Sequence, residues 1–117
     1  MSAEEPKGPE ARLVLTTAPD GAVARDLARS LIEGRLAACV QCIPGVTSVY
    51  RWEGEMEEAQ EVLLIIKTTA GRLEALEDAV AAEHPYETPE FVALEPVLVS
   101  APYLAWLRES VAQDEGA

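Results

Sequence analysis

An unbroken apolar run, Val62-Leu-Leu-Ile-Ile66, constrains the fold of this chain more than any other feature. Successive side chains of a β-strand point to opposite faces of the sheet, so a strand without polar residues is buried on both faces. Two shorter runs of the same kind occupy residues 13–15 and 91–94. The sequence therefore predicts a sheet that needs a cover on each side.

Four strands are expected. The first covers residues 12–17, and the second covers residues 36–52 with an interruption at Pro44-Gly45 that is typical of a bulge or bend. The turn Glu53-Gly54-Glu55 leads into a third strand over residues 57–67. The fourth strand covers residues 91–99.

Three helices complete the pattern. Apolar residues recur at helical spacing between Asp20, a suitable N-cap, and Gly34, which ends the segment. A second helix carries an apolar stripe from Leu73 to Val80 and ends before Pro85, and a third begins near Ser100. The order β-α-β-β-α-β is that of the ferredoxin-like sandwich, an α+β fold with helices on one face of a four-stranded antiparallel sheet.

Self-association follows from this arrangement. Two helices cover only one face, and each large aliphatic side chain left in water forgoes about 1.5–3 kcal/mol of burial. The hairpin arms, residues 46–52 and 57–66, are also longer than the first and fourth strands can pair, and bare strand edges invite a neighbour. A second copy of the chain is the simplest cover.

The charge excludes several partners. The 117 residues include 21 acidic and nine basic ones, a net charge of −12, which repels nucleic acid and anionic membranes. No apolar run reaches the roughly 18 residues that a membrane span needs. The acidic, proline-rich residues 1–11 are expected to form a disordered tail, residues 12–113 a single domain and residues 114–117 a C-terminal tail.

The two cysteines, Cys39 and Cys42, stand three positions apart in an apolar strand. Such positions point to opposite faces, so the pair cannot easily close a disulfide or share a metal ion. We interpret both as free structural thiols in a reducing compartment, and we predict a cytoplasmic location.

The segment His84-Pro-Tyr-Glu-Thr-Pro-Glu90, called the ribbon below, joins the second helix to the fourth strand. Each proline stiffens the segment and keeps the preceding residue extended. The ribbon carries the only histidine of the chain. Two interpretations stay open: His84 is a metal ligand or proton-transfer group, or it is an ordinary junction residue.

Candidates for a ligand pocket come from the ribbon and from the hairpin. They are Tyr50, Trp52, Glu61, Lys67, Tyr86 and Glu90. Tyr50 and Trp52 share one face of the hairpin and would serve equally well at a subunit interface, where aromatic residues are enriched. Lys67 either holds an anionic ligand or forms a structural ion pair.

A series of short motifs runs in order from Leu13 to Val111. The motifs are Thr17-Ala-Pro-Asp20, Leu36-Ala-Ala-Cys39, Ile43-Pro-Gly-Val-Thr-Ser-Val-Tyr50, Trp52-Glu-Gly54, Ile66-Lys-Thr-Thr69, His84-Pro-Tyr86, Thr88-Pro-Glu90 and Tyr103-Leu-Ala-Trp-Leu107. Together they resemble the CutA family of divalent-cation tolerance proteins. The resemblance implies a ferredoxin-like protomer, a homotrimer assembled by long hairpins, and a role in tolerance of divalent metals, copper above all, with no established catalytic reaction.

The same resemblance implies a metal site. In enterobacterial members of the family, copper has been associated with a cysteine, here Thr16, and with two adjacent histidines, here Glu83 and His84. The thiolate and one imidazole are missing, and these are the soft ligands that select copper. The resemblance therefore implies a site with harder ligands, the imidazole of His84 and the carboxylate of Glu83, for copper, zinc or another divalent ion.

Three classes of function remain. The favoured one is a trimeric, non-enzymatic divalent-cation tolerance protein without an organic cofactor, whose partners are its own copies and divalent cations. The second is a small-ligand sensor resembling the PII signalling proteins, although the chain lacks a glycine-rich phosphate loop. The third is an enzyme that uses Cys39 with His84, or His84 with Glu87 or Glu90, but a buried cysteine without electropositive neighbours is a poor nucleophile.

Overall fold

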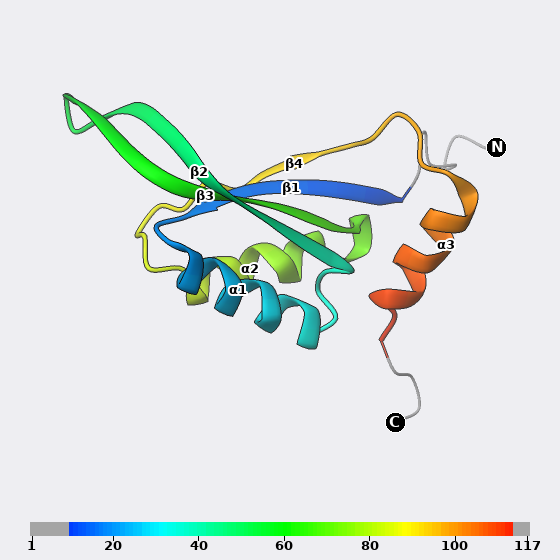
Figure 1. The fold of residues 1–117 in the computed structure, drawn as a ribbon. Coiled ribbons are helices and arrows are strands. Elements are labelled where there is room, and N and C mark those ends of the chain that lie inside the picture. Colours follow the sequence, from blue (N-terminus) through cyan, green and yellow to red (C-terminus); the bar gives the residue numbers. More distant parts are fainter. Residues whose placement is uncertain (1–9, 114–117) are drawn as a thin grey trace.

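The computed structural model describes residues 10–113; residues 1–9 and 114–117, and with them most of both expected tails, lie outside the described part. The elements in chain order are β1 (Ala11–Ala18), α1 (Gly21–Glu33), β2 (Cys39–Trp52), β3 (Glu55–Thr69), the 3-10 helix η2 (Ala70–Arg72), α2 (Leu73–Glu83), β4 (Val92–Leu94) and α3 (Ala101–Ser110). The predicted element order is confirmed (Figure 1).

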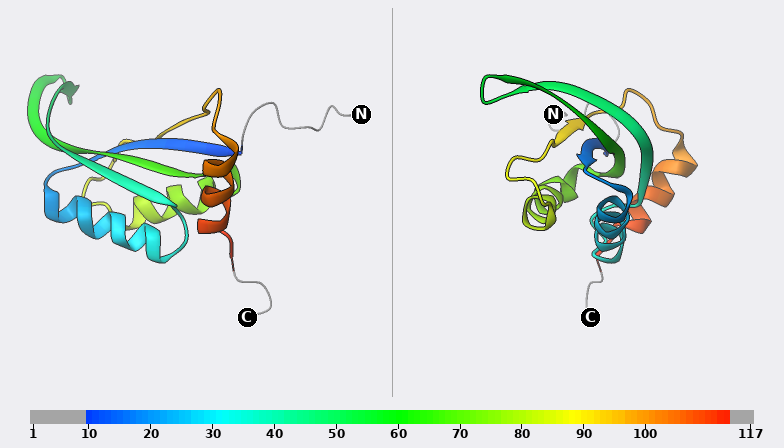
Figure 2. Two further views of the ribbon diagram at one scale, coloured as in Figure 1. Left: turned by 45° about the vertical axis from the view of Figure 1, so that its right-hand side comes forward. Right: turned by 60° about the vertical axis from the view of Figure 1, so that its left-hand side comes forward.

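The strands form one antiparallel sheet in the order β2-β3-β1-β4. Helices α1 and α2 lie side by side on one face of it, as the views of Figure 1 and Figure 2 agree. The predicted α+β class, with a four-stranded antiparallel sheet covered by helices on one face, is therefore confirmed.

The hydrophobic core fills the space between the sheet and these two helices. Its largest side chains, each less than 2% exposed, are Val14, Leu31, Leu64, Ile66, Leu76 and Val80. Each of these burials stabilises the fold by about 1.5–3 kcal/mol relative to an exposed side chain. The core thus holds the helices against the sheet and fixes the ends from which the site residues project.

Helix α1 begins and ends as the sequence indicates. The side chain of Asp20 accepts a hydrogen bond from the Val23 amide at 2.9 Å, and the amide of Gly34 donates to the Ser30 carbonyl at 3.0 Å. These bonds satisfy backbone groups that a helix end otherwise leaves without partners. The amides of Leu36 and Ala37 still bond back to Leu31, so β2 begins at Cys39 and not at residue 36.

The interruption predicted at Pro44-Gly45 is present. The register between β2 and β3 shifts between Ile43 and Val46, which is the signature of a bulge. Gly45 has φ +79°, a left-handed conformation that glycine adopts without the steric cost of a Cβ.

The hairpin turn is tighter than the predicted one. Trp52 pairs directly with Glu55, so only Glu53 and Gly54 form the loop, and both have positive φ. Two such residues suit the right-handed twist of a hairpin. As a result β3 begins at Glu55 and ends at Thr69, longer at both ends than the predicted residues 57–67.

The predicted overhang of the hairpin is confirmed. Strand β1 pairs with β3 only over residues 62–69, so residues 55–60 have β2 as their sheet neighbour. Figure 2 shows the tip of the hairpin curving away from the rest of the molecule. One edge of β3 is therefore unpaired along this stretch within the described residues.

The fourth strand is the largest departure from the prediction. It spans Val92–Leu94, not residues 91–99. Pro96 lacks the amide hydrogen that a ladder bond requires, and it ends the pairing with β1. The apolar run continues outside the sheet, where Val97 and Leu98 are 96% and 84% exposed.

The face of the sheet opposite the helices is incompletely covered. Cross-strand pairs place Leu13 with Leu94, and Leu15 with Val92, on this face. The two β4 side chains are 44% and 45% exposed, whereas Leu13 and Leu15 are half-buried. The apolar strands are thus fully covered only on the helix side.

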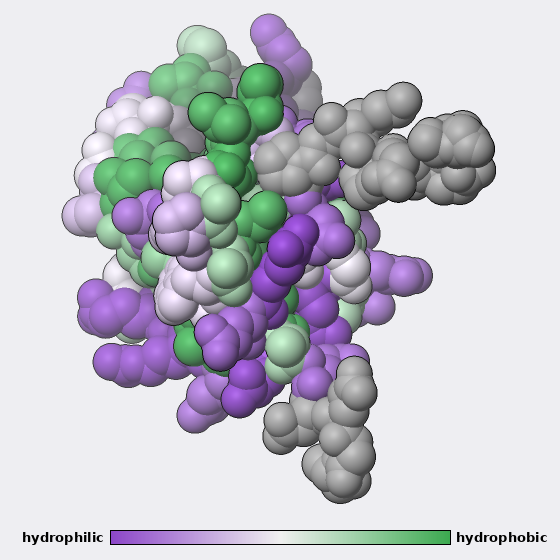
Figure 3. All heavy atoms as spheres, turned by 90° about the vertical axis from the view of Figure 1, so that its right-hand side faces the viewer, coloured by the Kyte–Doolittle hydropathy of each residue, from purple (hydrophilic) through white to green (hydrophobic). Residues whose placement is uncertain are grey.

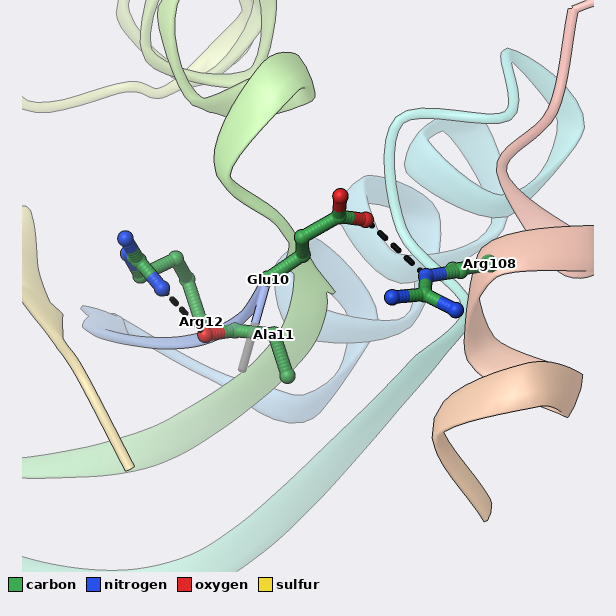
Figure 4. A network of polar contacts seen from close by, with 4 residues as sticks. All are labelled: Glu10, Ala11, Arg12 and Arg108. Atoms are coloured by element: carbon green, nitrogen blue, oxygen red, sulfur yellow. Dashed lines mark hydrogen bonds and ion pairs between the residues drawn. The ribbon is translucent and has the colours of Figure 1, made fainter. Parts of the chain in front are cut away.

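Helix α3 packs against the end of the sheet. The Nε of Arg108 donates to Glu10 at 2.9 Å, and Arg12 donates to the Ala11 carbonyl at 2.8 Å (Figure 4). Leu107, a residue of α3, is buried on the side of the helix that faces the sheet. Seen from the α3 end, hydrophobic side chains gather on the upper part of the surface (Figure 3).

Both cysteines are free, as predicted. Cys39 pairs with Lys67 and Cys42 with Leu64, three positions along β3, so the two thiols point to opposite faces of the sheet. Burial raises the pKa of the Cys42 thiol, and the charge of Arg25 offsets this only in part. Cys42 therefore stays a protonated packing residue.

Candidate functional site

His84 follows the last residue of α2 and is 8% exposed. Its Nε2 lies 2.6 Å from the carbonyl oxygen of Thr17, and its Nδ1 lies 3.0 Å from the amide nitrogen of Tyr86. A carbonyl only accepts and an amide N–H only donates, so Nε2 carries the hydrogen and Nδ1 accepts. The neutral imidazole therefore joins the end of β1 to the ribbon.

Glu83 points elsewhere. Its Oε2 accepts a hydrogen bond from the hydroxyl of Ser30 at 3.0 Å and so links α2 to α1. Within residues 10–113, no group of three or more His, Cys, Asp or Glu side chains is placed to hold a metal ion. Because a metal ion needs a free nitrogen lone pair, and Nδ1 of His84 already uses its own, the geometry of this chain does not fit a copper or zinc ion at His84 with Glu83.

Thr16 belongs to the core. It lies on the helix side of β1 and is 0% exposed, and no residue between 10 and 113 forms a hydrogen bond with its Oγ1. Its neighbour Thr17 points to the other side, toward the ribbon. The position that the family resemblance relates to a copper ligand is thus occupied here by a buried, unsatisfied hydroxyl.

Replacing Thr16 by valine is expected to stabilise the protein by about 1 kcal/mol, because it removes a buried polar atom without a partner and keeps the shape. Thr68→Val is the matched control: Thr68 is equally buried, but its hydroxyl donates to the Leu36 carbonyl at 2.7 Å, so this variant should be less stable than the parent. Urea unfolding measures both. Equal destabilisation by the two substitutions would show that Oγ1 of Thr16 is satisfied.

A cavity of about 570 Å³ lies between the hairpin and the ribbon. Five of the six predicted pocket residues line it: Tyr50, Trp52, Glu61, Tyr86 and Glu90. Sequence reasoning missed Thr17 and Ser48. Ser48 shares the alternating face of the hairpin with Tyr50, which was a usable signal, whereas no local pattern indicates that Thr17 meets the ribbon.

One hydrogen bond joins the two sides of the cavity, the ribbon and strand β3. The hydroxyl of Tyr86 donates to Oε2 of Glu61 at 2.8 Å, and the ring of Tyr86 lies 4.7 Å from that of His84, measured between centroids. Burial, then the hydrogen bond and the negative charge of Glu61, raise the pKa of Tyr86 to about 12. Tyr86 is therefore a neutral donor at physiological pH.

Lys67 does not join this cavity. It pairs with Leu13 near the C-terminal end of β3, and its Nζ lies 5.7 Å from the ring centroid of Tyr103 in α3. Six positions along an extended strand separate it from Glu61, a span of roughly 20 Å. The structure thus brings together neither a Lys67–Glu61 ion pair nor the complete predicted set of pocket residues.

The charges of the cavity have a single sign. Its charged lining residues are Glu61, Glu87 and Glu90, and none of the described lining residues is basic. Such a wall attracts cations and repels phosphates. Nor does this lining place a cysteine, serine or threonine beside a free histidine base, because both nitrogens of His84 are bonded. Fold and cavity define a ferredoxin-like α+β protein with an acidic, aromatic cavity.

Comparison with known proteins gives the family. Residues 12–110 match the family of CutA1 divalent ion tolerance proteins. The divalent-cation tolerance protein CutA of Thermus thermophilus is 51% identical over 98 residues, which cover 84% of this chain and 95% of that protein. The chain belongs to the CutA1 divalent ion tolerance family, and the predicted resemblance is confirmed.

Solved structures agree. The crystal structure of CutA from Xylella fastidiosa superposes with a TM-score of 0.86 at 38% identity, covering 88% of this chain and 99% of that one. The CutA of Archaeoglobus fulgidus, described as a periplasmic divalent cation tolerance protein, gives 0.85 at 34% identity, covering 87% and 99%. The Thermus and Archaeoglobus relatives are named as divalent-cation tolerance proteins, none of the three is named as an enzyme, and they give no support to the PII-like alternative.

Of the helices within residues 10–113, none combines the length and the apolar character that crossing a bilayer requires. The cytoplasmic location stays a prediction, since the Archaeoglobus relative is described as periplasmic.

Proposed function

We propose that this protein acts in divalent-cation tolerance as a non-enzymatic homotrimer. The observation that carries the proposal is the apolar, incompletely covered face of the sheet. On this face Ile43, Val92 and Leu94 are 42%, 45% and 44% exposed, beside the half-buried Leu63 and Ile65. Contiguous apolar surface of this kind marks an interaction site.

The hairpin supports interlocked copies. Beyond the reach of β1, residues 55–60 have an unpaired edge, and Val49 and Met56 near the tip are 61% and 76% exposed. An exposed strand edge with apolar neighbours favours pairing with another chain. The family resemblance implies three copies, each contributing one hairpin.

Of the properties that the family resemblance implies, metal binding at a defined site has the least support in this chain. The donor set at His84 and Glu83 does not fit a copper or zinc ion, because Nδ1 of His84 accepts from the Tyr86 amide. We therefore derive no step through a metal ion held there. Divalent cations are attracted instead by the net charge of −12, an interaction that is weak and unselective.

The proposal includes the absence of catalysis and a cytoplasmic location. Free thiols at Cys39 and Cys42 suit a reducing compartment. The raised pKa of Cys42 and the fully bonded imidazole of His84 leave these candidates poorly suited as nucleophile and base. The third class of function, an enzyme, is therefore disfavoured.

Light scattering coupled to gel filtration tests the assembly. We expect a single species of close to three times 12.6 kDa at micromolar concentration. A monodisperse monomer would show that the uncovered face is stable in water, and would contradict the proposal. A dimer would keep the covered face but contradict the three-fold assembly.

A further inference from the structure

Glu61 is a buried carboxylate without a cationic partner. It is 8% exposed, and among residues 10–113 no basic side chain forms an ion pair with it. A buried charge destabilises a fold unless hydrogen bonds or an opposite charge compensate it. Among residues 10–113 the one buried side-chain atom without a hydrogen-bond partner is Oγ1 of Thr16, so the free oxygen of Glu61 is open to the cavity and can meet water or a cationic ligand there.

The hydrogen bond from Tyr86 reaches only one of the two carboxylate oxygens of Glu61. Oε2 of Glu61 accepts from the tyrosine hydroxyl at 2.8 Å, and no described residue donates to Oε1. Tyr86 remains a neutral donor because its pKa is raised to about 12. It orients the carboxylate without cancelling its charge, and it leaves one oxygen for a ligand.

Aromatic side chains line the same cavity as Glu61. Tyr50 and Trp52 lie on the same face of β2, are 45% and 48% exposed, and line the cavity together with Tyr86. The faces of such rings attract cations, and tryptophan attracts them most strongly. A cavity lined by a carboxylate and three aromatic rings suits a cation that also carries apolar surface.

The alternatives fit less well. A bare metal ion would need several close ligands, and the described residues provide no cluster of three or more metal-binding side chains. An anion would meet Glu61, Glu87 and Glu90 with no basic residue among the described lining. The volume of about 570 Å³ lies within the range of small-molecule sites.

We propose that this cavity binds a small organic ammonium ion. The ammonium group donates a hydrogen bond to Oε1 of Glu61, and its apolar body lies against Tyr50, Trp52 and Tyr86. This inference does not depend on the proposed role in cation tolerance. It assigns a ligand class to a site that metal binding leaves unused.

Calorimetry with three probes of similar shape tests the inference: phenethylammonium, the neutral 2-phenylethanol and the anionic 3-phenylpropionate. We expect phenethylammonium to bind about tenfold or more tightly than the other two, because only it combines a cation with a ring. Glu61→Gln should weaken its binding by about tenfold, since the charge is lost while the shape is kept. The matched control Glu77→Gln, on the exposed side of α2, should leave binding unchanged.

Several outcomes would overturn the inference. Equal binding of the three probes would mean that the cavity does not select for charge, and unchanged binding by Glu61→Gln would place the probe elsewhere. If the intact protein binds no probe and Glu61→Gln alters the mass in light scattering, a basic side chain of a second copy fills the cavity. A monomeric protein that still binds phenethylammonium through Glu61 would contradict the homotrimer and leave this inference intact.

Discussion

Ile65→Glu is expected to yield monomers in place of the proposed trimer and to abolish the proposed protection against divalent cations. Ile65 lies at the centre of the uncovered face, paired with Leu15 on one side and with Gln41 on the other. A glutamate buried there without a partner would destabilise the assembly by about 3–5 kcal/mol per subunit. Light scattering reports the mass, and growth of a bacterial strain that lacks its own tolerance protein reports function under copper stress.

Two further variants keep this test decisive. Leu94→Glu changes a side chain on the same face that is already 44% exposed, so the single chain should tolerate it while the assembly does not. Ala82→Glu, on the exposed surface of α2, adds the same charge away from the face and should change neither mass nor growth. A trimer that survives both Ile65→Glu and Leu94→Glu would place the interface elsewhere.

The order of elements was predictable because it depends on local periodicity. Apolar alternation and helical spacing are read within a few residues, and caps such as Asp20 mark the boundaries. The end of the fourth strand was missed because apolar composition alone extended it past Pro96, whose missing amide ends the pairing. The hairpin turn was drawn too wide because positive φ at Glu53, a non-glycine residue, is not indicated by residue type.

The cavity was predictable in part for a similar reason. Tyr50 and Trp52 share a face by strand alternation, and the ribbon has few conformations between its prolines. Alternation gives the face of a residue but not its position along the strand, so Lys67 was grouped with Glu61 although Glu61 lies in the middle of β3 and Lys67 near its C-terminal end. A local pattern contains no information about that distance.

The role of His84 depends on the tertiary structure. Its Nε2 meets the carbonyl of Thr17, which is 67 positions away in the sequence, and only the packing of α2 beneath β1 brings the two together. The sequence left open whether the lone histidine on the stiff ribbon is a ligand or proton-transfer group, or an ordinary junction residue. In the structure both nitrogens of the imidazole are bonded to the backbone, which favours the junction role.

This geometry predicts that His84→Ala lowers the free energy of unfolding by roughly 2–5 kcal/mol, because two buried backbone groups lose their partners. His84→Asn should cost less, since its side-chain oxygen can still accept from the Tyr86 amide. Thermal and urea unfolding measure both differences. A loss below about 0.5 kcal/mol for His84→Ala would mean that water replaces both bonds without penalty.

Copper calorimetry on the same variants separates a structural from a metal-binding role. We expect the parent, His84→Asn and Glu83→Gln to bind copper with the same weak affinity, because surface carboxylates hold the ion and the imidazole lone pair is in use. The folded His84→Asn protein is the decisive sample, since a change there cannot be ascribed to unfolding. If it binds copper about tenfold more weakly than the parent, the ion displaces the Tyr86 amide from Nδ1. The ribbon would then be a metal site that opens on binding, and His84 would be a ligand, the role that the family resemblance implies for this position.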